Sequence, residues 1–213
     1  MKTLQPVNYW SEATFRGEAA VLLAFTDEPE TQLILTRRAD HLKSHRGEVA
    51  LPGGKIDKTD RDFIATALRE SHEEIALPPT AVEVLGELDP MVTRFGVKVV
   101  PVVGVIAPDV VLTPSPDELD SIFRVPLSFF LRDERTRTDR GTVDGHAVAV
   151  PCWQWQQYEI WGVTAIILVN FMNRVLGQNI HTGVESLAQK TNGMIMPEEW
   201  LTDEDKQARD SKT

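Results

Sequence analysis

Residues 60–76 constrain the fold most, because they read as a helix with two different faces. Asp60 is a suitable N-cap, and Pro78-Pro79 ends the helix. On a helical wheel one side carries a mostly apolar stripe that is expected to face a core. Its members are Phe63, Ile64, Ala67, Leu68, Ser71 and Ile75.

Three carboxylates share one edge of this helix. Glu70 and Glu74 lie at the border of the apolar stripe, and Glu73 lies next to them, further toward solvent. Like charges three and four residues apart repel by roughly a few tenths of a kcal/mol per pair. The helix dipole also disfavours negative charge in the C-terminal half. Arg69 can relieve Glu73, but no Lys or Arg lies four residues beyond any of the three glutamates.

Compensation for these charges is therefore expected from outside the helix. A hard divalent cation fits best, because Mg²⁺ and Mn²⁺ take carboxylate oxygens as ligands. The alternative interpretation is a solvated acidic face. The position at the core edge and the missing basic partners weaken that alternative.

The loop before the helix is basic although the chain is acidic. Residues 35–48 contain four basic side chains and two acidic ones, a local charge of +2 against −10 for the whole chain. Pro52-Gly53-Gly54 follows, and glycine permits close backbone approach. Basic groups and free backbone N–H groups hold phosphate oxygens, while carboxylates hold a metal. The alternative is an ordinary turn whose arginines keep the loop soluble. The basic residues are Arg37, Arg38, Lys43 and Arg46.

The remaining pattern predicts strands at 19–26, 31–37, 82–88, 97–106 and 146–155, loops at 38–54 and 107–118, and a helix at 161–176. Strands and helices mix without strict alternation, which favours an α+β or sandwich fold over a doubly wound sheet. We expect a single domain over residues 1–196 and a polar tail over 197–213. The apolar 160–176 segment suits either the core or the interface of a homodimer.

Composition excludes several classes of function. The chain has 32 acidic and 22 basic residues, which argues against coating nucleic acid or an anionic membrane. Its apolar runs are too short to span a bilayer. Cys152 is the single cysteine, so no intramolecular disulfide can form. We read it as a small buried side chain. With no signal peptide in the N-terminal residues, a cytoplasmic protein is expected.

Residues 54–77, GKIDKTDRDFIATALRESHEEIAL, resemble the Nudix box. That pattern is Gly, five residues, Glu, seven residues, then Arg-Glu-aliphatic-x-Glu-Glu-x-Gly-aliphatic. There are four departures: Asp60 for the usual Glu, one extra residue before Arg69, Ser71 for an aliphatic residue, and Ala76 for the Gly that ends the helix. Ala at that place costs about 1 kcal/mol if its φ is positive. The matching positions are Gly54, Arg69, Glu70, Glu73, Glu74 and Leu77.

The preceding segment resembles the signature of the coenzyme A diphosphatase branch, approximately LLTxRSxxLxxHxGxxxFPGGKxD. Ala39 and Leu51 depart from its usual Ser and Phe. The similarity extends over roughly residues 16–176 and implies a Nudix α/β/α sandwich, an α+β fold with a central mixed sheet and the Nudix loop-helix-loop. The residues that we match to this signature are Leu35, Thr36, Arg37, Leu42, His45, Gly47, Pro52, Gly53, Gly54, Lys55 and Asp57.

The resemblance implies metal-dependent attack of water on a diphosphate. It makes Glu70 and Glu74 the expected ligands of Mg²⁺ or Mn²⁺, with Glu73 as a third ligand or a residue that orients the water. The Gly54 carbonyl completes the shell, and Arg69 positions the glutamates by an ion pair. Glu118 is the leading general base, with Asp120 behind it. The expected substrate contacts are Gly53, Arg37, Arg46 and Lys55.

Three functions are compatible with this resemblance. The first is hydrolysis of coenzyme A or its thioesters to (acyl-)4′-phosphopantetheine and adenosine 3′,5′-bisphosphate. The second is hydrolysis of another nucleoside diphosphate derivative, such as ADP-ribose, NADH or a dinucleoside polyphosphate. The third is an inactive scaffold that senses a nucleotide. Retention of all three clustered glutamates argues against the third function, and the 35–54 segment favours the first over the second.

Overall fold

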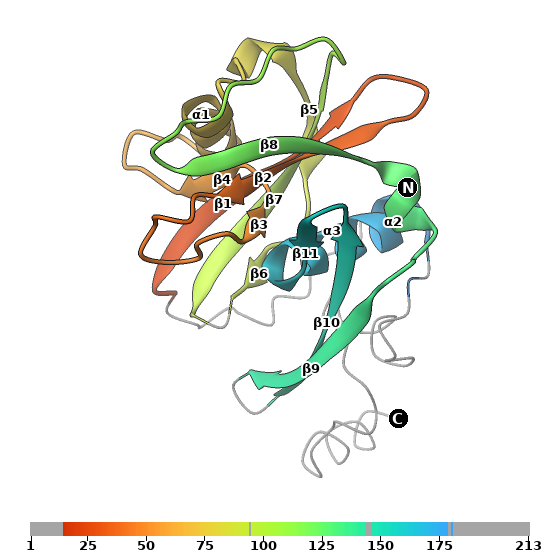
Figure 1. The fold of residues 1–213 in the computed structure, drawn as a ribbon. Helices are drawn as coiled ribbons and strands as arrows, with labels where there is room; N and C mark the ends of the chain where they lie inside the picture. The colour runs from red at the N-terminus through yellow and green to blue at the C-terminus, as the bar shows by residue number, and fades with distance from the viewer. Residues whose placement is uncertain (1–14, 94, 144–145, 179, 181–213) are drawn as a thin grey trace, which may run out of the picture.

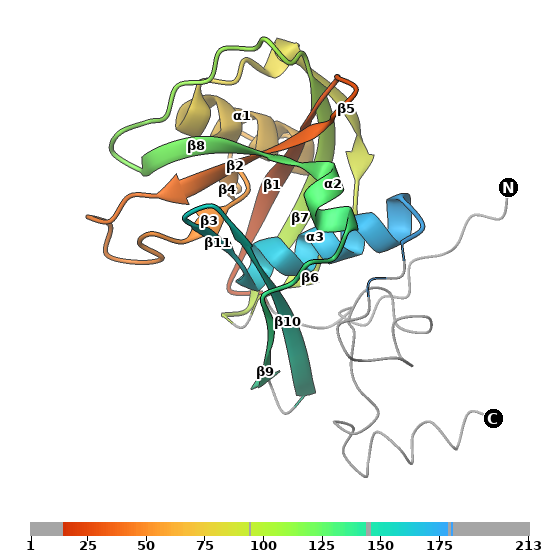
Figure 2. The same cartoon turned by 45° about the vertical axis from the view of Figure 1, so that its right-hand side comes forward.

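A computed structural model describes residues 15–93, 95–143, 146–178 and 180. Two helices lie on opposite sides of a central sheet, α1 (Phe63–Ile75) on one face and α3 (Gly162–Val175) on the other (Figures 1 and 2). This is the α/β/α arrangement with a mixed sheet that the Nudix resemblance implies. The predicted tail over 197–213 lies outside the described residues.

Over the described residues the central sheet has eight strands, and its main path runs β3-β2-β1-β7-β5. Its centre is a parallel pair, β1 and β7, aligned from Gly17 opposite Val97 to Thr26 opposite Ile106. The other pairs in the sheet are antiparallel, so the sheet is mixed. The strands are β1 (Gly17–Thr26), β2 (Gln32–Arg38), β3 (Val49–Ala50), β4 (Gly53–Lys55), β5 (Val82–Glu87), β6 (Met91–Val92), β7 (Val97–Ile106) and β8 (Leu119–Pro126).

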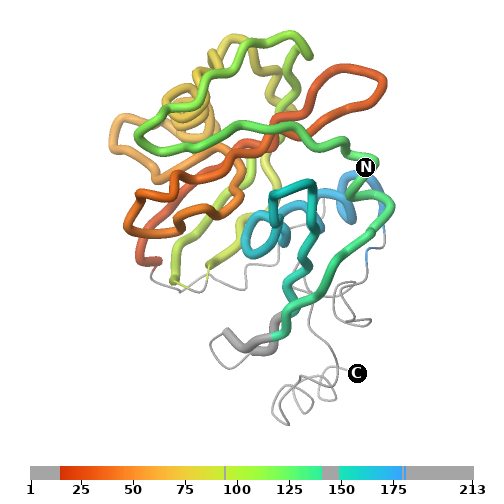
Figure 3. Tube along the Cα trace, viewed as in Figure 1, coloured from red at the N-terminus to blue at the C-terminus, as the bar shows by residue number. Residues whose placement is uncertain are grey.

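The remaining elements extend this core. A short 3₁₀ turn, η1 (Pro79–Ala81), follows α1, and α2 (Leu127–Leu131) follows β8. A second sheet of β9 (Arg137–Val143), β10 (His146–Trp155) and β11 (Tyr158–Ile160) lies on the α3 side of the molecule (Figure 3). Strands β8, β9 and β11 were not predicted from the sequence. The prediction of a loop over residues 38–54 is wrong in part, because β3 and the start of β4 form there.

Strand β1 divides the core, because its successive side chains point to opposite faces of the sheet. Leu22 packs in the cluster under α1, whereas Leu23 and Phe25 pack in the cluster under α3. A strand covered on both faces reads as a continuous apolar run, as residues 19–26 do. The pattern of that run therefore records that helices cover the sheet on both sides.

Helix α3 belongs to the core. Seven of its residues are buried, including Leu168, Phe171 and Met172, and Phe171 stacks on Phe25 of β1. Trp153 is fully buried, and Cys152 is a free, buried thiol, as expected. None of the helices in the described ranges combines the length and the apolar character of a membrane-spanning segment.

Candidate active site

Helix α1 starts later than the sequence indicates. Its N-cap is Asp62, whose Oδ1 accepts a hydrogen bond of 2.7 Å from the Ala65 N–H. The prediction that Asp60 caps the helix is wrong, because its carboxylate accepts hydrogen bonds from the Arg69 guanidinium instead. An aspartate suits either task, and only the folded chain decides which of the two caps the helix.

The helix ends at Ala76 in the left-handed conformation. Its φ is 54°, and its N–H donates to the His72 carbonyl at 3.0 Å. This is the place where the Nudix box usually has Gly. Because φ is positive, Ala at this position lowers the stability of the fold by about 1 kcal/mol relative to Gly.

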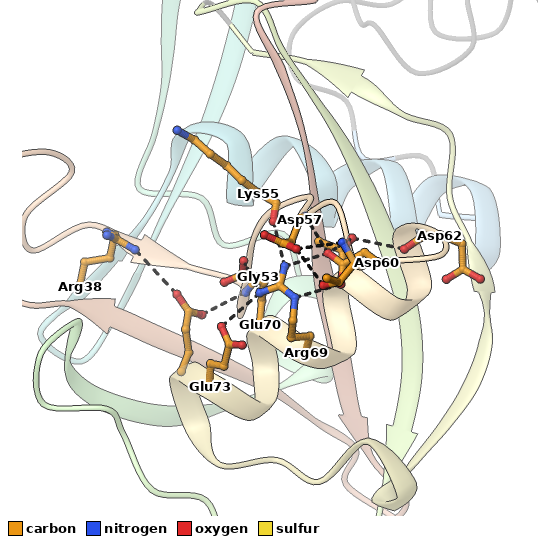
Figure 4. A network of polar contacts seen from close by, with 12 residues as sticks. Arg38, Gly53, Lys55, Asp57, Asp60, Asp62, Arg69, Glu70 and Glu73 are labelled. Atoms are coloured by element: carbon orange, nitrogen blue, oxygen red, sulfur yellow. Dashed lines mark hydrogen bonds and ion pairs between the residues drawn. The ribbon is translucent and has the colours of Figure 1, made fainter.

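Arg69 is the centre of the polar network in Figure 4. Its guanidinium donates to both carboxylate oxygens of Asp60, at 2.9 and 2.8 Å. It also donates to Glu70 at 2.9 Å, to Glu73 at 3.1 Å and to the Lys55 carbonyl at 3.0 Å. These bonds hold the pKa of the Asp60 carboxyl well below its usual range. The ion pair between Arg69 and the glutamates that the resemblance implies is therefore present, and it also ties α1 to the end of β4.

The three glutamates differ in burial as the helical wheel predicts. The side chain of Glu74 is 5% exposed, that of Glu70 is 18% exposed, and that of Glu73 is 57% exposed. Glu74 Oε2 accepts a hydrogen bond of 3.0 Å from the Gly53 N–H. The innermost carboxylate is thus held against the glycine turn rather than in solvent.

Both glycines of the turn are required by close packing. Gly53 has a φ of 151°, and a Cβ there would collide with the backbone of β1 at Ala20 and Val21. A Cβ on Gly54 would collide with the carboxylate of Glu70. The absence of side chains at these positions therefore lets the acidic edge of α1 lie directly against strand β4.

Burial raises the pKa values of two glutamates in this cluster, Glu70 and Glu74. Desolvation raises the pKa of Glu74 to about 7, because the Gly53 N–H and the Arg38 charge only partly oppose it. Desolvation also raises the pKa of Glu70, against the ion pair with Arg69. The negative charge of Glu118 adds to both shifts. The carboxylates of Glu70, Glu74 and Glu118 therefore lie close enough to repel one another.

Glu118 reaches this cluster because the connection between β7 and β8 is tied to α1. The Ser115 N–H donates to the Glu74 carbonyl at 2.8 Å, and the Thr113 N–H donates to the Ile75 carbonyl at 3.0 Å. The Glu118 carbonyl accepts from the Ala39 N–H at 2.9 Å. The connection thus curves around α1 before β8 begins (Figures 1 and 2). It places the leading candidate for the general base beside the glutamates.

The three predicted phosphate contacts with basic side chains lie in different surroundings. Arg37 is already ion-paired, with Asp40 at 2.7 Å and with Asp120. That ion pair occupies Asp120, the second candidate for the base. Arg46 is exposed in the loop between β2 and β3, and Lys55 is exposed at the end of β4. In Figure 4 the Lys55 side chain extends away from Arg69.

Arg38, which the sequence pattern gave only as one of four basic loop residues, lies in the site next to Glu74. Its NH1 lies 3.8 Å from Glu74 Oε1, and its Nε is buried without a hydrogen-bond partner in the described part of the chain. A register irregularity between Arg37 and Arg38 interrupts the pairing of β2 with β8 at this point. A signal was available: counted from Thr36, the Arg of the LLTxRS pattern falls on Arg38 rather than on Arg37.

The donor chemistry fits a hard divalent cation. Among the described residues no group of three or more His, Cys, Asp or Glu side chains already forms a metal-binding cluster. The Glu70 and Glu73 carboxylates are turned to Arg69, and Glu74 is turned to Gly53. The donors are nevertheless carboxylate oxygens, and burial raises the pKa values of two of them, Glu70 and Glu74. Such a set suits Mg²⁺ or Mn²⁺.

Comparison with known proteins finds one family model and several similar proteins. The NUDIX domain family model matches residues 16–144. A protein of Enterobacter sp. strain 638 described as an uncharacterized Nudix hydrolase, NudL, is 43% identical over 153 residues, 72% of this chain and 80% of that protein. The NudL protein of Escherichia coli O7:K1 is 44% identical over 155 residues, covering 71% and 79%. A MutT/nudix family crystal structure from Enterococcus faecalis, 16% identical, covers 83% of this chain and 65% of that chain with a TM-score of 0.47.

The chain is thus an enzyme of the class that hydrolyses phosphoric anhydride bonds in nucleoside diphosphate derivatives. It belongs to the Nudix hydrolase family. Nudix hydrolases generally depend on divalent metal ions, in agreement with the carboxylate donors on α1.

Proposed function

We propose that this enzyme hydrolyses the diphosphate bond of coenzyme A or its thioesters, with (acyl-)4′-phosphopantetheine and adenosine 3′,5′-bisphosphate as products. The observation that carries the proposal is the segment from Leu35 to Asp57. It resembles the coenzyme A diphosphatase signature, and in the fold it runs from β2 to the glycine turn that supports Glu74.

Glu70, Glu73 and Glu74, with the Gly54 carbonyl, are the proposed ligands of Mg²⁺ or Mn²⁺. When bound, such an ion neutralises the diphosphate and lowers the pKa of a bound water. Arg69, which Asp60 holds, keeps the carboxylates of Glu70 and Glu73 in place.

Glu118 is the proposed general base, because its negative charge acts on both Glu70 and Glu74 and its carboxylate has no ion-pair partner among the described residues. Asp120 is less suited to this role, since Arg37 already holds it. The proposed substrate contacts are Gly53, Arg37, Arg46 and Lys55.

A substrate panel tests the proposal. Purified protein is incubated with Mg²⁺ or Mn²⁺ and coenzyme A, acetyl-coenzyme A, ADP-ribose, NADH or a dinucleoside polyphosphate, and the products are separated by chromatography. We expect the highest kcat/KM for coenzyme A or its thioester. A preference for ADP-ribose, NADH or the dinucleoside polyphosphate would refute the proposed substrate and leave the hydrolase class intact. Turnover of none of them would support the nucleotide-sensing scaffold.

The same panel is run with two matched variants. Glu70→Gln removes a proposed ligand, and Glu87→Gln removes an exposed carboxylate at the end of β5 that is outside the proposed site. Loss of turnover in the first variant alone is expected. Light scattering on the same samples shows whether the protein forms the homodimer that the sequence left open.

A further inference from the structure

Two arginines, Arg69 and Arg38, pair with the glutamates of α1, and their guanidinium groups differ sharply in their contacts. Arg69 donates all five of its N–H groups, to Asp60 twice and once each to Glu70, Glu73 and the Lys55 carbonyl. It has no donor left for another group. Arg69 is therefore a permanent part of the framework that joins α1 to β4.

Arg38 is bound much more loosely. Its one ion pair in the described part of the chain is with Glu74, and the separation of 3.8 Å is longer than a hydrogen bond. Its Nε is buried and has no acceptor there. A buried donor without a partner calls for an explanation such as an unplaced water or ligand. The side chain is 28% exposed, so it lies next to the buried carboxylate while part of it remains accessible to solvent.

We propose that Arg38 is an exchangeable counter-ion: it neutralises Glu74 until a divalent cation binds the glutamates, and its guanidinium then pairs with the diphosphate of the substrate. This inference rests on the proposed metal site at Glu70 and Glu74. It adds a role for Arg38 that neither the ligand set nor the substrate contacts include.

The charges around Arg38 explain why such an exchange is favourable. Glu74 faces the negative charges of Glu70 and Glu118, and Arg38 is the cation that opposes them at Glu74. A dication held by the same carboxylates repels the guanidinium, whose interaction with Glu74 is then no longer needed. The planar fork of arginine suits two phosphate oxygens, and the unpartnered Nε supplies a donor for them.

Metal binding without substrate is the first test. Mn²⁺ affinity is measured by electron paramagnetic resonance on the whole protein and its variants. Arg38→Gln removes a competing positive charge, so we expect Mn²⁺ to bind about tenfold more tightly. Arg61→Gln removes the same charge from an exposed site beside Asp62 and is expected to leave the affinity unchanged. An unchanged or weaker affinity in Arg38→Gln would overturn the inference.

Binding of a diphosphate is the second test. Methylenediphosphonate, which cannot be hydrolysed, is titrated by calorimetry into protein saturated with Mn²⁺. Arg38→Gln should bind it at least about tenfold more weakly, since a bidentate charged contact is lost. Arg38→Lys keeps the charge without the fork, so it should match the parent protein in Mn²⁺ affinity while binding the diphosphonate less tightly. Diphosphonate affinity equal to the parent in both variants would refute the second half of the exchange.

Glu74→Gln separates this inference from the proposed metal site. If it weakens Mn²⁺ binding while Arg38→Gln changes nothing, the metal site stands and the counter-ion role is wrong. If Glu74→Gln leaves Mn²⁺ affinity intact, the ligand assignment itself is wrong. Circular dichroism identifies variants that fail to fold, and Arg38→Lys, the milder change, then carries the test.

Discussion

Replacing Glu74 by Gln should stabilise the metal-free enzyme while it abolishes activity. The carboxylate is buried, it accepts the Gly53 N–H, and the Arg38 guanidinium lies 3.8 Å away. These two groups offset the cost of burying the charge only in part, so the pKa of Glu74 stays raised. A Gln side chain has nearly the same shape and its Oε1 can accept the same N–H. The substitution therefore removes a charge whose burial is unfavourable without creating a cavity.

The size of the effect follows from the raised pKa. Burial moves the pKa of Glu74 from 4.5 to about 7 in the folded state. Because the folded protein keeps a proton that the unfolded chain has lost, stability falls as the pH rises from 4.5 to about 7. The loss from this group is about 1 kcal/mol at pH 5 and about 3 kcal/mol at pH 8, at roughly 1.4 kcal/mol per pH unit. The difference between Glu74→Gln and the parent should therefore widen by about 2 kcal/mol between these pH values.

Urea unfolding with EDTA, followed by circular dichroism at pH 5 and pH 8, measures this difference. Glu87→Gln on the exposed face of β5 serves as the control and should show no widening. Added Mg²⁺ should stabilise the parent at pH 8 and have little effect on Glu74→Gln, and turnover of the variant should fall by orders of magnitude. A stability difference that is the same at both pH values would refute the argument from burial. Near-normal activity would refute the ligand assignment.

Three further predictions follow from the same framework. Ala76→Gly relieves the left-handed φ of 54° at an exposed helix end, so it should stabilise the protein by about 0.5–1 kcal/mol, seen as a rise in Tm of a few degrees; an unchanged or lower Tm would contradict this. Asp60→Asn removes the charge that holds Arg69 through two hydrogen bonds. Because the Asp60 side chain is 4% exposed, the variant should lose about 2–4 kcal/mol of stability, measured by urea unfolding. A loss below about 0.5 kcal/mol would show that Glu70 and Glu73 are enough to hold Arg69 in place. Glu118→Gln should lower kcat at least about 100-fold with little change in Mn²⁺ affinity, whereas Asp120→Asn should change kcat much less; the reverse order would assign the base to Asp120.

Much of the fold could be read from local pattern. The apolar run of β1 and the stripe of α1 follow directly from which side chains must be covered, and both elements form close to the predicted residues. The short strands β3 and β4 could not be found in this way. Two or three residues carry no periodicity, and their pairing with β2 and β1 depends on contacts remote in sequence.

The sequence by itself determined the acidic edge of α1, because helical spacing alone brings Glu70, Glu73 and Glu74 together. It also determined that glycines precede the helix. Only the tertiary structure decided which charges face that edge. Glu118 arrives there because backbone hydrogen bonds tie its loop to the end of α1, and Arg38 arrives because β2 ends beside Glu74. The physical reason is that a charge acts through distance in space and through burial, neither of which is expressed in the order of residues along the chain.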